Sequence, residues 1–193
     1  MGGREEFLQI WQQHVTRPGS EKLLDWLGHK TDFFTAPAST RFHGACEGGL
    51  CMHSLNVYHA LHDTFFTEGD SEETFAICAL LHDLCKANYY KPGTRNVKNE
   101  ATGQWEKVPS YSVEDLFPYG HGEKSVFLIE RFMKLHIEEA VAIRWHMGGF
   151  DDAARGGCFA ISEAYDKYPL AVKLHIADLE ATYLMEHRTS AVR

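Results

Sequence analysis

A run of seven apolar residues, Phe75 to Leu81, ends directly in the pair His82-Asp83. Such a run is buried in a helical protein, and a carboxylate and an imidazole rarely enter apolar surroundings unless something compensates their desolvation. A metal cation is one such compensation, because imidazole and carboxylate are both metal ligands. Lys86 lies one turn further on, so a contact within the pair plus a surface ion pair is the alternative interpretation. The run therefore predicts a helical body with polar groups buried inside it.

Further histidines and a second aspartate occupy apolar segments elsewhere in the chain. The chain has twelve histidines, which is many for 193 residues. A single buried histidine is usually a core residue that has found a hydrogen-bond partner, but the whole set indicates metal binding. Adjacent helical residues point about 100° apart, so His82 and Asp83 can address two ions with Asp83 between them. The predicted ligands are His53, His82, Asp83, His121, His146 and Asp178, and the expected cofactor is one or two divalent ions of Mn, Ni, Co, Zn or Fe.

Other histidines are weaker candidates. His62-Asp63 is a second His-Asp dipeptide, but it precedes a polar stretch and is expected to be solvated. His175 lies one turn before Asp178 and is expected to support a ligand or to lie on the surface. The remaining histidines have no distinctive setting or look like surface residues: His14, His29, His43, His59, His136 and His187.

The helical period is interrupted once. Helices are expected at about 5–15, 21–27 (capped by Ser20), 50–66, 122–135, 137–145 and 168–187, and a further helix, capped by Ser71, is expected to carry the His82-Asp83 pair. Between 88 and 118 the period disappears, and two short strands at 89–93 and 101–108 predict a β-hairpin or lid inserted into an α-helical body. Glycines between 148 and 157 indicate a loop. The length fits one domain.

Charge and cysteine content narrow the function classes. The formal charge of −8 disfavours binding to duplex nucleic acid, because neutralising phosphates requires dense Lys and Arg. No apolar stretch is long enough for a transmembrane helix, and the N-terminus has no apolar core of a signal peptide. Five cysteines without a CxxC pair favour a reducing compartment, so we expect a cytoplasmic protein that contacts no membrane. The sequence carries no signal for an oligomeric state.

Four local segments resemble one enzyme family. They read GGLCMHS (48–54), LLHDLCK (80–86), GHG (120–122) and HIAD (175–178), in the order H…HD…H…H…D. This order is similar to that of the HD-domain superfamily of metal-dependent phosphohydrolases, in the branch related to bacterial 3′-5′ exoribonucleases. The resemblance covers about Phe42 to His187. Cys85 replaces the usual glycine of the second segment, and Met147 stands where many dinuclear members have a second histidine.

The resemblance implies a fold, a ligand set and an activity. The fold would be an all-α HD-domain bundle over 41–193 with an insertion at about 88–118, and residues 1–40 would form a helical segment packed on it. One metal would be held by His53, His82, Asp83 and Asp178, and a second by Asp83, His121 and His146. The activity would be hydrolysis of a phosphate monoester or diester by metal-activated water, on a nucleotide, a short oligonucleotide or a small phosphorylated metabolite.

Candidate catalytic and substrate-binding residues lie within or close to these segments. Asp83 and Lys86 are the catalytic candidates, and Lys86 and Arg144 are candidates for phosphate contact, although Lys86 is equally well placed for an i,i+3 contact with Asp83. Residues of the insertion such as Tyr90 and Trp105 are hypothetical specificity elements. Two alternatives stay open: a mixed-valence di-iron oxygenase, since some relatives use four His and two Asp, and a non-catalytic nucleotide-binding module.

Overall fold

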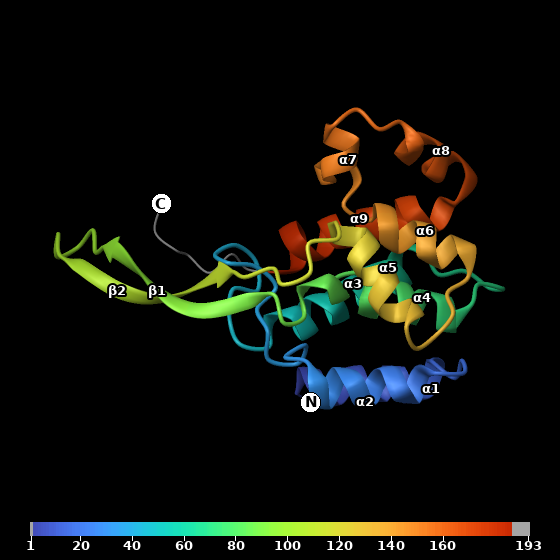
Figure 1. The fold of residues 1–193 in the computed structure, drawn as a ribbon, viewed down its shortest axis with the longest axis horizontal. Coiled ribbons are helices and arrows are strands. Elements are labelled where there is room, and N and C mark those ends of the chain that lie inside the picture. The colour runs from blue at the N-terminus through green and yellow to red at the C-terminus, as the bar shows by residue number, and fades with distance from the viewer. Residues whose placement is uncertain (1, 187–193) are drawn as a thin grey trace.

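The structure is a computed structural model, which describes residues 2–186. Within this range it is mostly helical, with one two-stranded antiparallel sheet (Figure 1). The predicted mainly-α fold with an inserted β-hairpin is therefore confirmed. The elements are α1 (Gly3–His14), α2 (Ser20–Lys30), α3 (Gly49–Phe65), α4 (Glu72–Leu81), η1 (Leu84–Lys86), β1 (Tyr90–Lys98), β2 (Trp105–Val113), α5 (His121–Glu130), α6 (Ile137–Trp145), η2 (Gly148–Phe150), α7 (Asp152–Arg155), α8 (Ala160–Lys167), α9 (Pro169–Glu180) and η3 (Ala181–Met185).

The core lies between α3, α4, α6 and α9. Helix α3 packs against α4 and α9, and α6 packs against α9, α5 and α4. Helix α4 is buried from Thr74 to Leu81, as its uninterrupted apolar run predicts. A helix that is apolar on all sides must be covered on all sides, so α4 occupies the middle of the bundle (Figure 1). Its C-terminal end delivers His82 and Asp83 into the interior.

The N-terminal helices α1 and α2 cover one side of this bundle (Figure 1). Phe7, Trp11, Leu23 and Leu27 are buried and belong to the same hydrophobic cluster as the residues of α3 and α4. The two helices therefore contribute to the common core and do not form a core of their own.

A buried ionic network joins the N-terminal helices to the bundle. The guanidinium of Arg17, in the turn between α1 and α2, donates to Glu139 of α6 through both Nη atoms, at 2.6 and 2.8 Å. It also donates to Glu73 of α4 at 3.3 Å. Glu139 is fully buried and accepts a further hydrogen bond from Thr74 Oγ1 at 2.9 Å. One arginine thus neutralises a carboxylate that has no access to water.

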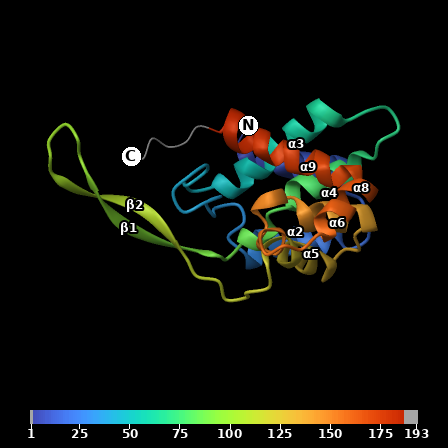
Figure 2. The same ribbon diagram turned by 90° about the horizontal axis from the view of Figure 1, so that it is seen from above.

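The inserted hairpin projects from the helical body as a long arm (Figure 2). Its strands pair from Tyr90 with Val113 to Lys98 with Trp105, so they are longer than the sequence predicted. Most of its side chains are exposed, and Trp105 is 71% exposed. The arm begins four residues after Lys86 and ends shortly before α5, so its base lies close to the segments that carry the predicted metal ligands.

Several helix boundaries differ locally from the expectation. Ser71 caps α4 as predicted, since its side chain accepts a hydrogen bond from the amide of Thr74. Ser20 does not cap the second helix: Gly19 does, in the left-handed region with φ of 95°, where a side chain would be strained. The predicted loop after Gly148 instead contains the short helices α7 and α8. The predicted helix 168–187 changes to a π-turn after Glu180, and His187 lies outside the described residues.

In the part of the chain that the structure describes, no helix combines the length and the apolarity that crossing a bilayer requires.

Candidate metal centre

Asp83 lies at the centre of a buried cluster of imidazoles and carboxylates. Its Oδ2 is 3.5 Å from Nε2 of both His53 and His82. Nε2 of His53 is also 3.2 Å from Nε2 of His82 and 3.2 Å from Oδ1 of Asp178. Lys86 adds an ammonium group 2.6 Å from the same Oδ2. One oxygen of Asp83 therefore faces two histidines and, beyond them, a second carboxylate.

The other oxygen of Asp83 faces a different pair of histidines. Oδ1 is 2.7 Å from Nε2 of His121 and 3.4 Å from Nε2 of His146. His121 is the more exposed of the two, and its ring also lies against the Cys85 thiol, with Nδ1 3.4 Å from Sγ. The six predicted ligands therefore converge around Asp83, the carboxylate that was predicted to be central. They come from α3, the ends of α4 and α6, the start of α5, and α9.

His82 and His146 are oriented by the same local device. Each follows the last residue of its helix, and its Nδ1–H donates to the carbonyl three residues earlier, Ala79 at 2.8 Å and Ile143 at 2.6 Å. These carbonyls belong to the last turns of α4 and α6, where helical partners run out. With the proton on Nδ1, each neutral ring directs a lone pair at Nε2 toward Asp83. The carbonyl ends of two helix dipoles also favour positive charge there.

His53 is oriented by a carboxylate instead. Its Nδ1 donates to Oε1 of Glu186 at 2.8 Å, and Asn56 Nδ2 donates to the same oxygen at 3.1 Å. Glu186 follows the π-turn after α9, so the end of the described chain folds back onto α3. Carboxylate–histidine pairs of this kind commonly fix the ring of a metal ligand and raise its basicity.

The spacing of these groups is close to that of ligands around one cation. Nε2 of His53 and Nε2 of His82 are 3.2 Å apart, so one ion can contact both atoms. Nε2 of His146 is buried and has no hydrogen-bond partner among the described residues. Ligand atoms about 2.1 Å from one ion lie about 3.0 to 3.4 Å from each other. His53, His82 and Asp83 lie 3.2 to 3.5 Å from one another and form a group that can hold an ion. Asp178 lies 3.2 Å from His53 and belongs to a neighbouring group with His82 and His146.

The second half of the cluster is partly closed by a direct hydrogen bond. Nε2 of His121 and Oδ1 of Asp83 are 2.7 Å apart, which is a hydrogen-bond distance, whereas His146 stays 3.4 Å away. The described residues therefore offer one set with ligand spacing and a second set, Asp83, His121 and His146, in which a proton occupies the space between two groups.

Cationic side chains balance the carboxylates of the cluster. Burial opposes the ionisation of Asp83, but Lys86 and His82 hold its pKa well below the usual range. Burial likewise opposes a charged His53, yet hydrogen bonds with Asp178 and Glu186 raise its pKa to about 9. Burial opposes a charged His121 too, but Cys85 and Asp83 raise its pKa to about 10. Protons on these two histidines thus compensate the buried carboxylates, and a divalent cation would supply the same compensation.

Close backbone packing sets the position of His121. A Cβ on Gly122 would lie 2.3 Å from the carbonyl oxygen of Arg144, so only glycine lets α5 approach α6 this closely. Ser125 Oγ, one turn along α5, accepts a hydrogen bond from the amide of Cys85 at 3.0 Å. Helix α5 is thereby held against both η1 and α6, and its first residue reaches Asp83.

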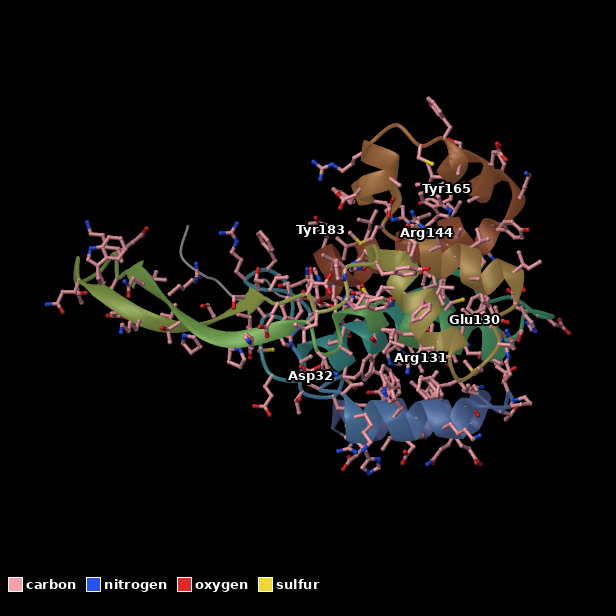
Figure 3. The ribbon with its side chains drawn as sticks, viewed as in Figure 1. Asp32, Glu130, Arg131, Arg144, Tyr165 and Tyr183 are labelled. Carbon is pink, nitrogen blue, oxygen red and sulfur yellow. The ribbon has the colours of Figure 1, made fainter. Side chains whose placement is uncertain are left out.

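Arg144 is not part of the cluster. Its guanidinium lies 2.5 Å from a carboxylate oxygen of Glu123 and 2.8 Å from one of Asp151, and it covers the ring of Trp145. Figure 3 labels Arg144 within the helical body. Both acids neutralise it, so nothing in its surroundings assigns it to phosphate binding. The His62-Asp63 pair lies outside the cluster as well, with the Asp63 side chain 78% exposed.

Three further residues complete the site. His175 Nδ1 donates to the carbonyl of His146 at 2.6 Å, which is the supporting role expected for it. His43 and Glu186 were not expected: together with His53 they form a further group that can hold an ion. Burial and the neighbouring His53 lower the pKa of His43 to about 4, so it is neutral. Neither residue lies in a periodic apolar segment, and no sequence signal singles them out.

Imidazole and carboxylate oxygen together suit Mn, Fe, Co, Ni or Zn, and disfavour Ca and Mg, which prefer oxygen ligands alone. The donor set thus agrees with a divalent transition metal, as expected from the sequence, and does not choose among these ions.

Removing the carboxylate behind His53 tests this arrangement. Glu186→Gln is expected to weaken metal binding by about 10- to 100-fold, because His53 loses its anionic hydrogen-bond partner while keeping its place. Titration of chelator-treated protein with Mn²⁺ or Zn²⁺ measures the change. Glu180→Gln on α9 is the matched control, because among the described residues its carboxylate accepts a hydrogen bond only from the exposed Thr64, and it should bind as wild type. Equal affinities of the two variants would contradict the supporting role of Glu186.

Comparison of the chain with protein-family models, with curated proteins and with solved structures finds no match in any of the three. The function is therefore inferred from the residues of this chain and from their geometry.

Proposed function

We propose that the protein is a metal-dependent phosphohydrolase of the HD superfamily that acts on a phosphate monoester or diester, such as a nucleotide or a short oligonucleotide. The observation that carries the proposal is the position of Asp83, whose two oxygens face two separate pairs of histidines. The motif order of the sequence supports it, since the segments that resemble the HD pattern are the ones that meet at this point.

Each group in the cluster has a role in this proposal. His53, His82, Asp83 and Asp178 hold the first cation, and His121 and His146 join Asp83 around a second. A cation held there lowers the pKa of a bound water toward neutrality and offsets the negative charge of a phosphoryl group. Lys86 is 13% exposed at its side chain, and its ammonium lies between Asp83 and the cavity beside His121.

Lys86 therefore both fixes Asp83 and presents positive charge to a substrate. Its i,i+3 contact with Asp83 is compatible with binding of a phosphoryl oxygen, because an ammonium group has three donors and Asp83 accepts one of them. The pKa of Asp83 lies well below its usual range, so Asp83 is ionised at neutral pH and available as a ligand.

One observation favours a second candidate, a mixed-valence di-iron oxygenase. All four histidines and both aspartates of the expected six-residue set reach the cluster, including His121 and His146. That is the ligand count such oxygenases use. We rank hydrolysis first because the segments of the sequence resemble the hydrolases of the superfamily.

Elemental analysis and activity assays separate the candidates. Protein purified without chelator is expected to contain a divalent transition metal. Supplied with Mn²⁺, Ni²⁺ or Co²⁺, it is expected to release phosphate from nucleotides or mononucleotides from short oligonucleotides. Removal of the metal with chelator should abolish release, and metal addition should restore it. Oxygen uptake with an EPR-active mixed-valence iron signal would instead establish the oxygenase. Tight nucleotide binding without turnover across all of these metals would indicate a binding module.

A further inference from the structure

A cavity of about 380 Å³ opens directly beside the candidate metal centre. It lies between η1, the segment that follows the hairpin, and the start of α5, and its polar lining comprises Lys86, Tyr89, Asp115, His121, Lys124 and Asp152. Lys86 and His121, which both contact Asp83, form the part of the lining next to the centre. A volume of this size suits a small ligand and not a polymer.

Lys124 lines the same cavity and is unusually buried for a lysine. The residue is 7% exposed, and its ammonium group contacts one carboxylate, Asp115 Oδ1 at 2.7 Å. The rings of Tyr89 and Phe117 lie 5.1 and 5.8 Å from Nζ and provide cation–π contacts. An ammonium group has three donors, and Asp115 is its only hydrogen-bond acceptor among the described residues, so donor capacity remains for a ligand in the cavity.

The position of Asp115 makes it an exchangeable partner. Asp115 lies on the connection between β2 and α5, and its side chain is 27% exposed and lines the same cavity. Burial acts against its ionisation, but the hydrogen bond and charge of Lys124, together with the amide of Phe117, lower its pKa. An anion that enters the cavity and Asp115 would therefore compete for the same ammonium group.

We propose that Lys124 binds a second anionic group of the substrate, separate from the phosphoryl group that meets Asp83 and Lys86. This inference rests on the proposed function, because it places the scissile group at the metal centre. The substrate class is then a small molecule with two anionic groups, such as a nucleoside bisphosphate or a dinucleotide. Lys124 is in this view a specificity-determining residue and not a catalytic one.

Binding of two nucleotides to the metal-loaded protein tests the proposal. Adenosine 3′,5′-bisphosphate and adenosine 5′-monophosphate are titrated calorimetrically into wild type, Lys124→Met and Asp115→Asn. Lys124→Met is expected to lose about 10- to 100-fold in affinity for the bisphosphate, the range typical of a hydrogen bond to a charged group, and less than about 2-fold for the monophosphate. Asp115→Asn is expected to bind the bisphosphate more tightly, because it frees the ammonium group.

The opposite signs of these two effects distinguish binding from a structural role. If the ion pair only stabilised the connection before α5, both variants would bind both nucleotides more weakly. The affinities for the bisphosphate and for the monophosphate would then fall by the same factor. Either that result or unchanged binding by Lys124→Met would overturn the proposal. Should Lys124→Met fail to fold, Asp115→Asn decides alone, and an unchanged or lower bisphosphate affinity refutes the inference. Lys167→Met is the control, since Lys167 pairs with Glu163 at 3.1 Å on the distant α8 and its side chain is 66% exposed.

The same titrations separate this inference from the proposed function. They require no turnover, so discrimination between the two nucleotides in a protein that releases no phosphate would contradict the hydrolase and leave the second anion site standing. Phosphate release without such discrimination would contradict the second anion site alone.

Discussion

Asp83→Asn is expected to remove the metal and the activity together. Asparagine keeps the shape of the side chain but neither the negative charge nor the second ligand oxygen, and Asp83 is the residue that both halves of the cluster share. Loss of an outer partner of a ligand already weakens metal binding about 10- to 100-fold, so loss of this ligand should weaken it by more than about 100-fold. Phosphate release should fall by at least about 10³-fold, since both the cation and its charge are lost.

The chain supplies its own control for this variant. Asp63→Asn changes the aspartate of the other His-Asp dipeptide, which lies on α3 with its side chain 78% exposed. It should keep wild-type metal content, as measured by elemental analysis, and wild-type turnover. Full metal content and full turnover in Asp83→Asn would remove the basis of the proposed function. A loss in both dipeptide variants would show that the assay reports folding and not the site.

Arg17→Met is expected to lower the free energy of unfolding by about 3 to 5 kcal/mol. The substitution leaves the carboxylate of Glu139 buried without its counter-charge, and breaking a buried ion pair from one side usually has a cost of this size. It also removes the link between the N-terminal helices and the bundle. Because domains are stable by only about 5 to 15 kcal/mol, the loss would be a large part of the total. Urea denaturation followed by circular dichroism measures it.

Two further variants show whether the buried charge is the cause. In Arg17→Met/Glu139→Gln both charges are absent, so the double variant should recover part of the lost stability. Arg131→Met removes an exposed arginine whose guanidinium lies over the ring of Phe132 and has no ion pair within residues 2–186. It should change the free energy of unfolding by less than about 1 kcal/mol. If the double variant is no more stable than Arg17→Met, the loss of stability comes instead from the contacts of the aliphatic stem of Arg17.

Local sequence patterns were sufficient for most of the helices. The apolar run of α4, its cap at Ser71 and the bounds of α6 are confirmed because each depends on interactions within one turn of helix. The hairpin lies in the predicted segment, but its second strand begins at Trp105 and not at Ala101, and the first strand extends to Lys98. Pairing between the two strands decides these bounds, and turn residues alone do not mark them. Gly19 replaced Ser20 as the cap of α2 because the backbone there passes very close to the carbonyl of Phe132, a contact between distant segments.

The candidate site was likewise predicted from the sequence only in part. Its six expected ligands converge, because each was marked by a polar side chain in an apolar segment, and such residues need a common partner. Glu186 and His43 were missed because their role arises only when the end of the described chain and the segment before α3 are folded against His53. Arg144 was close to His146 in sequence, but its guanidinium is paired with two carboxylates outside the cluster.

By itself the sequence determined that this chain is a helical body with an inserted hairpin and a set of buried imidazoles and carboxylates. Those conclusions follow from periodicity and from the energy of burying charge, which act along the chain and need no knowledge of contacts between distant segments. Only the tertiary structure decided that one oxygen of Asp83 faces His53 and His82 while the other faces His121 and His146. It also decided that Lys124 lines the cavity beside the centre. Direction and distance between side chains depend on how helices pack, and packing is a property of the whole fold.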